Sequence, residues 1–280
     1  MGDHYIPQHY LKGFTDESKR LWVFDKQDRR AFETQVKSIA NETGFYSAVV
    51  ESRLANEVEG PGNEVLDAIR SRAQVSKSRK RVLAAYMACM LKRVPATKQW
   101  VRELTPGMIE KMVEDVRNQL DVLDQKEPER KELWKQRRFE LANAPQGFVE
   151  DIVKSAFLKQ VMPGASPKIV AMLNRMTWQF LTLDRRPAFL ASDNPVFFFR
   201  GLGLAHNQCE VSFPISSNIA LWATWRADLE EGYVSARESW VQELNRRTAS
   251  SATRYLFHAV DEEWILPLLS KSTWRINVLK

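Results

Sequence analysis

The sequence predicts an α+β protein in which a mixed or antiparallel sheet, built from N-terminal and C-terminal segments, encloses a large helical middle. Short apolar runs bounded by turn residues, which are typical of strands, occur in the first fifty residues and again after residue 187. Residues 53–181 instead carry the three- and four-residue apolar spacing of helices. No segment repeats, so we expect a single α+β domain over residues 1–280, with a mainly helical region at 53–181.

The elements before residue 100 can be placed from their end signals. Pro7 suits the first turn of a short helix over residues 8–12, and Leu21–Asp25 has the aromatic and β-branched composition of a strand. Ser78 is the expected N-cap of a longer helix, which Pro95 is expected to end. Further helices are expected at residues 106–123, 128–141, 147–161 and 167–181.

The C-terminal part returns to short strands around one helix. The strands are expected at residues 188–191, 196–199, 211–214, 219–225 and 254–260, and the helix at 235–250. Asp193-Asn194-Pro195 lies in the turn between the first two strands. Asp and Asn are ordinary turn residues because their side chains bond their own backbone. A carboxylate at the end of a strand is also a frequent position for a metal ligand or a general base.

Positive charge is concentrated in one segment of the chain. The net charge is +6, and the ten Lys and Arg residues from Arg70 to Arg102 are accompanied by no Asp or Glu in that stretch. Such a concentration attracts phosphate backbones through counterion release, so we expect RNA or DNA as a partner. The residues expected to bind nucleic acid are Lys77, Arg79, Lys80, Arg81, Lys92 and Arg93. The alternative is a solvated helical face whose acidic partners lie nearby in space.

Several familiar protein classes are excluded because their motifs are absent. The sequence contains no GxxxxGK[ST] loop, no complete dinucleotide fingerprint, no CxxC pair, no HExxH and no GxSxG elbow. Its longest apolar stretch, residues 82–91, has about half the length of a membrane span, and its start lacks a targeting pattern. Two distant cysteines do not make a secreted disulfide framework. We therefore expect a cytoplasmic protein without a membrane span.

Two stretches of the chain resemble a known family. His4-Tyr5-Ile6-Pro7-Gln8-His9-Tyr10-Leu11-Lys12-Gly13-Phe14 is similar to the HYxPQxYLxxF opening of the bacterial family labelled domain of unknown function 4238. Phe189–Val196 resembles the FLTSDNPV signature of that family, with Ala191 where threonine is common. Weaker matches follow in the family's order at Leu21–Asp25, Phe45–Ser47, Glu59, Arg93–Pro95, Asn245 and Arg254–Phe257.

The resemblance implies that five polar residues belong to one site. They are His4, Gln8, Glu59, Asp193 and Asn194. We expect the N-terminal segment to pack across the turn at 193–195, so that these groups converge. They could then cleave a phosphodiester, with His4 as base or with Glu59 and Asp193 holding Mg²⁺ or Mn²⁺. The expected function is a nuclease or phosphodiesterase, and because members of this family look like accessory bacterial genes, a toxin or phage-defence effector.

Three other hypotheses stay open at this point. The protein could be a non-catalytic module that binds nucleic acid or a partner protein, with the helices at 106–161 as a possible contact surface. It could act on a nucleotide-like small molecule in a closed pocket lined by Trp22, Tyr46 and Trp222. Alternatively, His4 and Asp193 could form a buried pair whose only role is to hold the N-terminus on the sheet.

Overall fold

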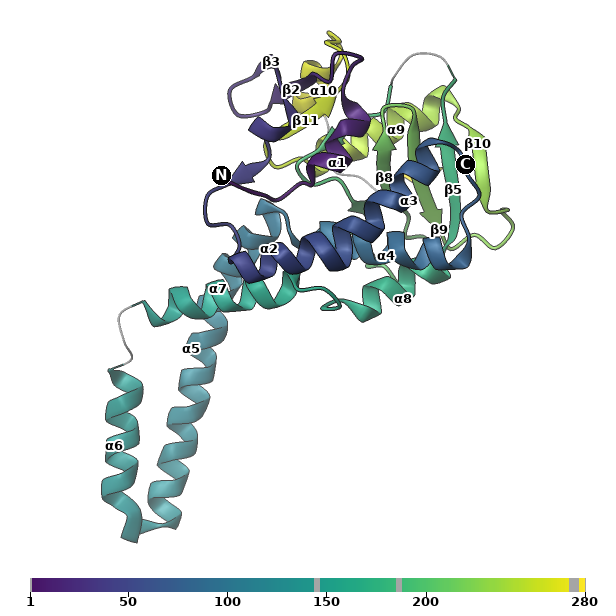
Figure 1. Ribbon diagram of the computed structural model, residues 1–280. Helices are drawn as coiled ribbons and strands as arrows, with labels where there is room; N and C mark the ends of the chain where they lie inside the picture. The colour runs from purple at the N-terminus through teal and green to yellow at the C-terminus, as the bar shows by residue number, and fades with distance from the viewer. Residues whose placement is uncertain (1, 144–146, 185–187, 272–276, 280) are drawn as a thin grey trace. The chain divides into compact units, whose positions relative to one another are not determined.

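The computed structural model describes residues 2–143, 147–184, 188–271 and 277–279, and it confirms the α+β class (Figure 1). Contacts divide the chain into two compact units, whereas the sequence predicts a single domain. The first, here called the sheet unit, comprises Met1–Ala96 and Val161–Lys280. The second, the helical unit, comprises Thr97–Gln160.

The strands of the sheet unit form three sheets within the described residues. The two-stranded sheet pairs β1 (Asp3–His4) with β4 (Asn41–Glu42). The four-stranded sheet has the order β3 (Arg30–Thr34), β2 (Leu21–Asp25), β11 (Tyr255–His258) and β6 (Ala191–Ser192). The five-stranded sheet has the order β10 (Gly232–Ser235), β5 (Thr177–Thr182), β9 (Ile219–Thr224), β8 (Val211–Ser216) and β7 (Phe197–Phe198). Only β10 and β5 pair in parallel among these described strands. The pairing of β2 with β11 confirms that the two ends of the chain share a sheet.

The helices of the sheet unit lie mostly before residue 93. They are α1 (Gln8–Leu11), η1 (Lys12–Phe14), η2 (Val36–Ser38), α2 (Ala48–Leu54), η3 (Ala55–Glu59), α3 (Gly60–Arg70), α4 (Lys77–Lys92), α8 (Pro167–Arg175), α9 (Glu238–Ser251) and α10 (Ile265–Lys271). The N-cap of α4 is Ser76, whose hydroxyl accepts a hydrogen bond from the Arg79 N–H (3.3 Å), so the expected cap at Ser78 is wrong by two residues. A capping side chain must precede the first helical residue, and only Ser76 does.

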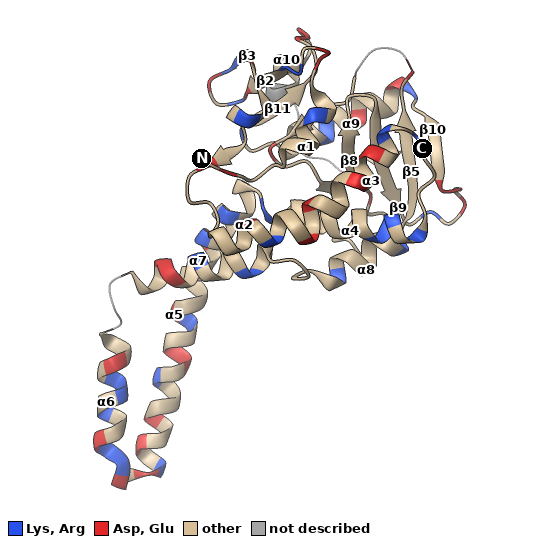
Figure 2. Cartoon of the chain, in the orientation of Figure 1, with Lys and Arg blue, Asp and Glu red and all other residues tan. Residues whose placement is uncertain are grey.

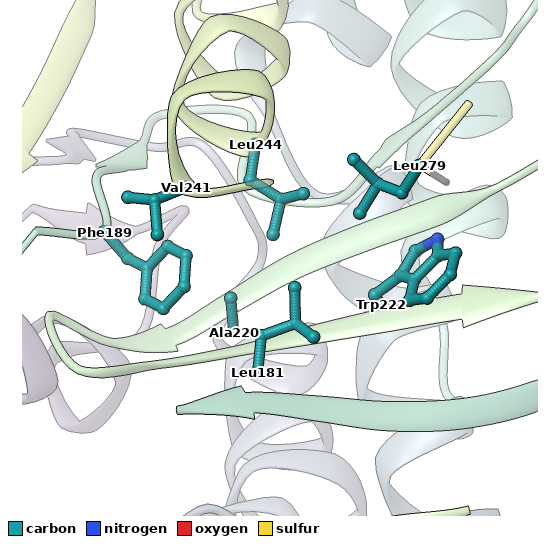
Figure 3. Close-up of a cluster of buried hydrophobic side chains, with 7 residues drawn as sticks. All are labelled: Leu181, Phe189, Ala220, Trp222, Val241, Leu244 and Leu279. Carbon is teal, nitrogen blue, oxygen red and sulfur yellow. The ribbon is translucent and has the colours of Figure 1, made fainter. Parts of the chain in front are cut away.

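The five-stranded sheet is covered on both faces. On one face, α9 places Val241 and Leu244 over Leu181, Ala220 and Trp222 (Figure 3). These side chains alternate along β5 and β9 with others that point to the opposite face.

On that opposite face, the ring of Phe213 in β8 stacks on Tyr10 of α1, with ring centroids 5.2 Å apart, and also meets Tyr86 of α4. Helices α3 and α4 approach closely at Gly62, because a Cβ there would lie 2.2 Å from Cδ2 of Tyr86. The sheet therefore fixes the position of α4, the helix that carries much of the basic segment.

Three expected element boundaries are corrected by the structure. Residues 177–181 form β5 instead of the end of a helix, because this strand is buried between β10 and β9 and has apolar side chains on both faces, Trp178 and Phe180 on one and Leu181 on the other. Strand β10 replaces the expected start of the helix at 235, since α9 begins at Glu238. Pro95 begins a helix instead of ending one, which is the other position in which proline is favoured.

The helical unit contains most of α5 (Pro95–Lys126), η4 (Pro128–Arg130), α6 (Lys131–Ala142) and nearly all of α7 (Phe148–Val161). Arg138 of α6 ties this helix to α5 by donating to Asp121 (2.9 Å) and Asp124 (3.1 Å). Exposed apolar side chains recur every four residues along α5, at Trp100, Leu104, Met108, Met112 and Val116. Within the described residues, no helix of either unit is long and apolar enough to cross a membrane.

Candidate functional site

The Asp193 carboxylate closes the turn between β6 and β7. It is 1% exposed and accepts three backbone hydrogen bonds, from Thr253 (2.8 Å), Arg254 (2.7 Å) and Tyr255 (3.1 Å). Burial raises the pKa of Asp193 to about 6, although the three N–H groups favour the charged form. The Asp193 side chain therefore links the start of β11 to the β6–β7 turn by hydrogen bonds.

Asn194 holds the same turn against the end of α9. Its Nδ2 donates to the Ser251 carbonyl (3.1 Å), and the Ser251 hydroxyl donates to the Asn194 carbonyl (3.0 Å). The Asn194 side-chain oxygen, Oδ1, is buried and has no hydrogen-bond partner within the described protein.

Arg93 brings together two of the predicted catalytic residues. Its guanidinium is 1% exposed and donates to the Glu59 carboxylate (2.5 Å) and to the His4 backbone carbonyl (2.6 Å). The guanidinium also lies over the Tyr46 ring, and the Tyr46 hydroxyl donates to the Arg93 carbonyl (2.9 Å). Arg93 was expected to bind nucleic acid on the surface. This expectation is wrong, because the Arg93 guanidinium is buried and paired with the Glu59 carboxylate, 34 residues away in the sequence.

The remaining predicted catalytic residues do not join one cluster. His4 is half-buried and its Nε2 lies 3.3 Å from the Lys37 carbonyl, while burial lowers the pKa of its imidazole. Gln8 begins α1 and is half-buried. In the opening segment, burial and, to a smaller degree, the charge of Asp193 raise the pKa of Tyr5. His4 and Asp193 bond to different groups, so the pair considered in the structural alternative does not form.

The carboxylates do not fit a shared divalent cation. Glu59 is bound to Arg93, and both oxygens of Asp193 accept backbone N–H groups. The described residues contain no group of three or more His, Cys, Asp or Glu side chains that could hold a metal ion. A hard cation such as Mg²⁺ requires several oxygen ligands around one point. The donor set around Glu59 and Asp193 therefore does not match Mg²⁺ or Mn²⁺.

The Lys and Arg side chains of the basic segment contact different parts of the sheet unit. Arg70 donates to the carbonyls of Tyr10 (3.0 Å) and Ile215 (3.2 Å), so it fastens α1 to β8. Lys80 pairs with Glu231 and lies over the Trp178 ring. The expected nucleic-acid contacts at Lys80 and Arg93 are thus occupied by long-range partners that the local sequence does not reveal.

An exposed basic surface remains at the start of α4 (Figure 2). We define the α4 basic patch as Arg72, Lys77, Arg79 and Arg81, all of which are exposed. Arg72 pairs with Asp184, and Arg79 donates to the Gln74 carbonyl (2.9 Å). The other two form no ion pair with a described residue.

A cavity of about 380 Å³ adjoins the α4 basic patch. Arg72 and Lys80 line it together with the aromatic residues Trp178, Phe180 and Tyr233. Burial raises the pKa of the Tyr233 hydroxyl, which donates to the Ala73 carbonyl (2.7 Å), whereas the positive charges of Arg79 and Arg72 lower that pKa. Basic and aromatic side chains therefore meet at the edge strand β10. Tyr233 is not among the site residues predicted from the sequence, because strand β10 was not predicted either.

The three aromatic residues proposed for a closed small-molecule pocket lie in separate environments. Trp222 packs beneath α9 (Figure 3), Trp22 packs against the cluster around Phe24, and Tyr46 binds Arg93. The small-molecule hypothesis therefore finds no support from these side chains.

A buried ionic network was also missed. Arg247 of α9 is 0% exposed and donates to Glu243 (3.0 Å), Glu210 (2.6 Å) and the Asn277 carbonyl (2.5 Å). Glu210 in turn accepts the Leu279 N–H (3.1 Å). The network attaches residues 277–279 to the sheet unit. Its only local signal was Glu243 at four-residue spacing from Arg247, a common surface pattern.

Comparison with known families agrees with the resemblance of the opening and signature segments. The family described as "Protein of unknown function (DUF4238)" matches residues 3–262, and the chain belongs to it. No curated protein and no solved structure matches the chain.

Proposed function

We propose that this protein binds nucleic acid, with single strands preferred, through the α4 basic patch and the adjoining aromatic cavity. The observation that carries the proposal is the sequence of the first helical turns of α4. Lys77, Arg79 and Arg81 are exposed there, and no acidic residue occurs in the first turn.

This arrangement is electrostatically unfavourable without an anion. The N-terminus of a helix carries a partial positive charge, and acidic side chains are the ones that stabilise it. Cations at this end add to the positive potential instead of reducing it. Asp184 and Glu231 neutralise only Arg72 and Lys80. A phosphate group would be attracted both by the side chains and by the helix end.

The aromatic side chains explain the preference for single strands. Proteins that bind single strands combine a positive groove with rings on which unpaired bases stack. Tyr233 is half-buried at the cavity beside Arg72, and its ring centroid lies 5.2 Å from that of Phe180, so aromatic surface adjoins the charges. In a duplex the bases are already stacked on each other, and only the phosphate contacts remain.

The binding experiment is a fluorescence anisotropy titration with short labelled single-stranded RNA and with duplex DNA. The test variant carries Lys77→Gln, Arg79→Gln and Arg81→Gln. The matched control carries Lys111→Gln, Arg117→Gln and Lys126→Gln, which removes three exposed charges from α5. We expect at least about tenfold weaker binding in the test variant and little change in the control. Equal weakening in both would reduce the effect to net charge, and no binding by wild type would end the proposal.

Strand cleavage is a second candidate function, and the state of His4 favours it. Because burial lowers the pKa of this histidine, its imidazole is neutral near pH 7, as a general base must be. Glu59 and Arg93 lie beside it. A toxin or phage-defence effector would act through such cleavage.

The test is incubation of labelled RNA with wild type and with His4→Ala, in Mg²⁺, Mn²⁺ and EDTA. Cleavage that survives in a folded His4→Ala variant would remove this histidine from the mechanism. Binding by wild type without cleavage in any of the three conditions would leave the protein as a non-catalytic binding module.

A further inference from the structure

The cavity beside the α4 basic patch contains an ion pair that phosphate contacts do not explain. Lys80 of α4 and Glu231, which directly precedes β10, both line this cavity and pair with each other. The Glu231 side chain is 52% exposed, so a ligand in the cavity can reach its carboxylate. A carboxylate repels phosphate groups. Its presence in a nucleic-acid site therefore indicates a contact with a base, which is the part of a nucleotide that carries sequence information.

The ion pair is held in position by the backbone around the start of β5. Lys80 Nζ donates to the Met176 carbonyl (2.8 Å), and Glu231 Oε1 accepts the Trp178 N–H (3.2 Å). An ammonium group has three N–H donors, and a carboxylate has two oxygens that can each accept more than one hydrogen bond. Glu231 Oε2 accepts no hydrogen bond from the described residues. Both partners thus keep hydrogen-bonding capacity for a ligand.

The pair presents the same hydrogen-bonding pattern as the pairing edge of cytosine. The carboxylate offers two acceptor oxygens, and the neighbouring ammonium offers a donor. On the Watson–Crick edge of guanine, N2 and N1 are donors and O6 is an acceptor, so guanine is complementary to this pattern. Uracil has a single N–H between two carbonyl oxygens, which the carboxylate would repel. The Watson–Crick edges of a single strand are unpaired and therefore available for such contacts.

We propose that this cavity selects a guanine base of the single strand bound at the α4 basic patch. Glu231 accepts hydrogen bonds from N1–H and N2–H, Lys80 donates to O6, and the base lies against the aromatic surface at Tyr233. The cavity volume of about 380 Å³ is in the range of small-molecule sites. This inference rests on the proposed nucleic-acid binding and adds base specificity to it, because phosphate contacts alone are independent of sequence.

The test is fluorescence anisotropy with labelled oligouridine strands whose central residue is uridine, inosine or guanosine. Wild type should bind the guanosine strand about tenfold more tightly than the uridine strand, and the inosine strand, which lacks the 2-amino group, should lie between them. Glu231→Gln should remove this preference and strengthen binding of the uridine strand, because a repelling charge is lost. Glu230→Gln removes a neighbouring exposed carboxylate that does not line the cavity, so it should keep the preference.

The comparison of the three strands uses wild type alone, so it does not depend on the folding of a variant. Equal affinity for all three would overturn guanine selection and leave the nucleic-acid proposal standing, whereas no binding of any strand would end both. A preference that survives in a folded Glu231→Gln variant would remove this carboxylate from recognition. Guanosine 5′-monophosphate, titrated alone, distinguishes a free nucleotide from a strand. An affinity equal to that of the guanosine strand would overturn the assignment of the base to a strand.

Discussion

Replacing Asp193 by alanine should destabilise the sheet unit by about 3 kcal/mol. The change leaves three partly buried N–H groups without their acceptor, those of Thr253, Arg254 and Tyr255. At about 2 kcal/mol for each unsatisfied group, the loss is about 6 kcal/mol. Part of this loss is offset, because removing the carboxylate also removes the cost of burying its charge. Its pKa rises from 3.8 to about 6, and at about 1.4 kcal/mol for each pKa unit this amounts to about 3 kcal/mol.

The assay is urea unfolding followed by circular dichroism at pH 7.5, where the carboxylate is ionised. Asp193→Asn keeps one acceptor oxygen and should lie between wild type and Asp193→Ala. Asp261→Ala, a change at an exposed carboxylate, is the control and should alter the free energy of unfolding by less than about 0.5 kcal/mol. The structural role of Asp193 is refuted if Asp193→Ala is as stable as this control while a measurable activity is lost.

Three further predictions concern other parts of the chain. Arg93→Met should lower the free energy of unfolding in urea by about 3 kcal/mol, because it leaves the Glu59 carboxylate without its ionic partner. Adding Glu59→Gln should recover part of that loss. No recovery would show that the two side chains are not coupled. Burial lowers the pKa of His258, so the unfolded chain takes up a proton that the fold excludes as the pH falls below about 6.5. Wild type should therefore lose stability relative to His258→Asn between about pH 7 and pH 5, and a difference that is constant with pH contradicts the assignment. The exposed apolar side chains of α5 have the i, i+4 spacing with which helices pack on each other. The double change Met108→Gln with Met112→Gln should therefore lower any self-association seen by analytical ultracentrifugation. An unchanged mass distribution would exclude these side chains as the contact.

The sequence is sufficient for the class of fold but not for all boundaries. The pairing of β2 with β11 follows from two aromatic runs at opposite ends of the chain. Strand β5 was mistaken for helix because both of its faces are buried, so the alternation that marks a strand is absent. Helix α5 continues through Pro106, where a break was expected, although a proline inside a helix costs about 3 kcal/mol.

The candidate site was less predictable, for a physical reason. A run of cations looks like one surface in the sequence, yet each side chain is free only if no partner reaches it. Lys80 meets Glu231, which is 151 residues away, and Arg93 meets Glu59, which is 34 residues away. Neither contact has a local signal. Lys77, Arg79 and Arg81 kept their exposure because they occupy the solvated start of α4.

The salt dependence of RNA binding tests the central proposal most directly. The slope of log K against log salt counts the phosphates that the protein neutralises, at about 0.7 for each phosphate on a single strand. Removing Lys77, Arg79 and Arg81 should therefore reduce the slope by about 2, while the control change at Lys111, Arg117 and Lys126 leaves it unchanged. An identical slope for wild type and both variants would mean that the α4 basic patch does not contact nucleic acid.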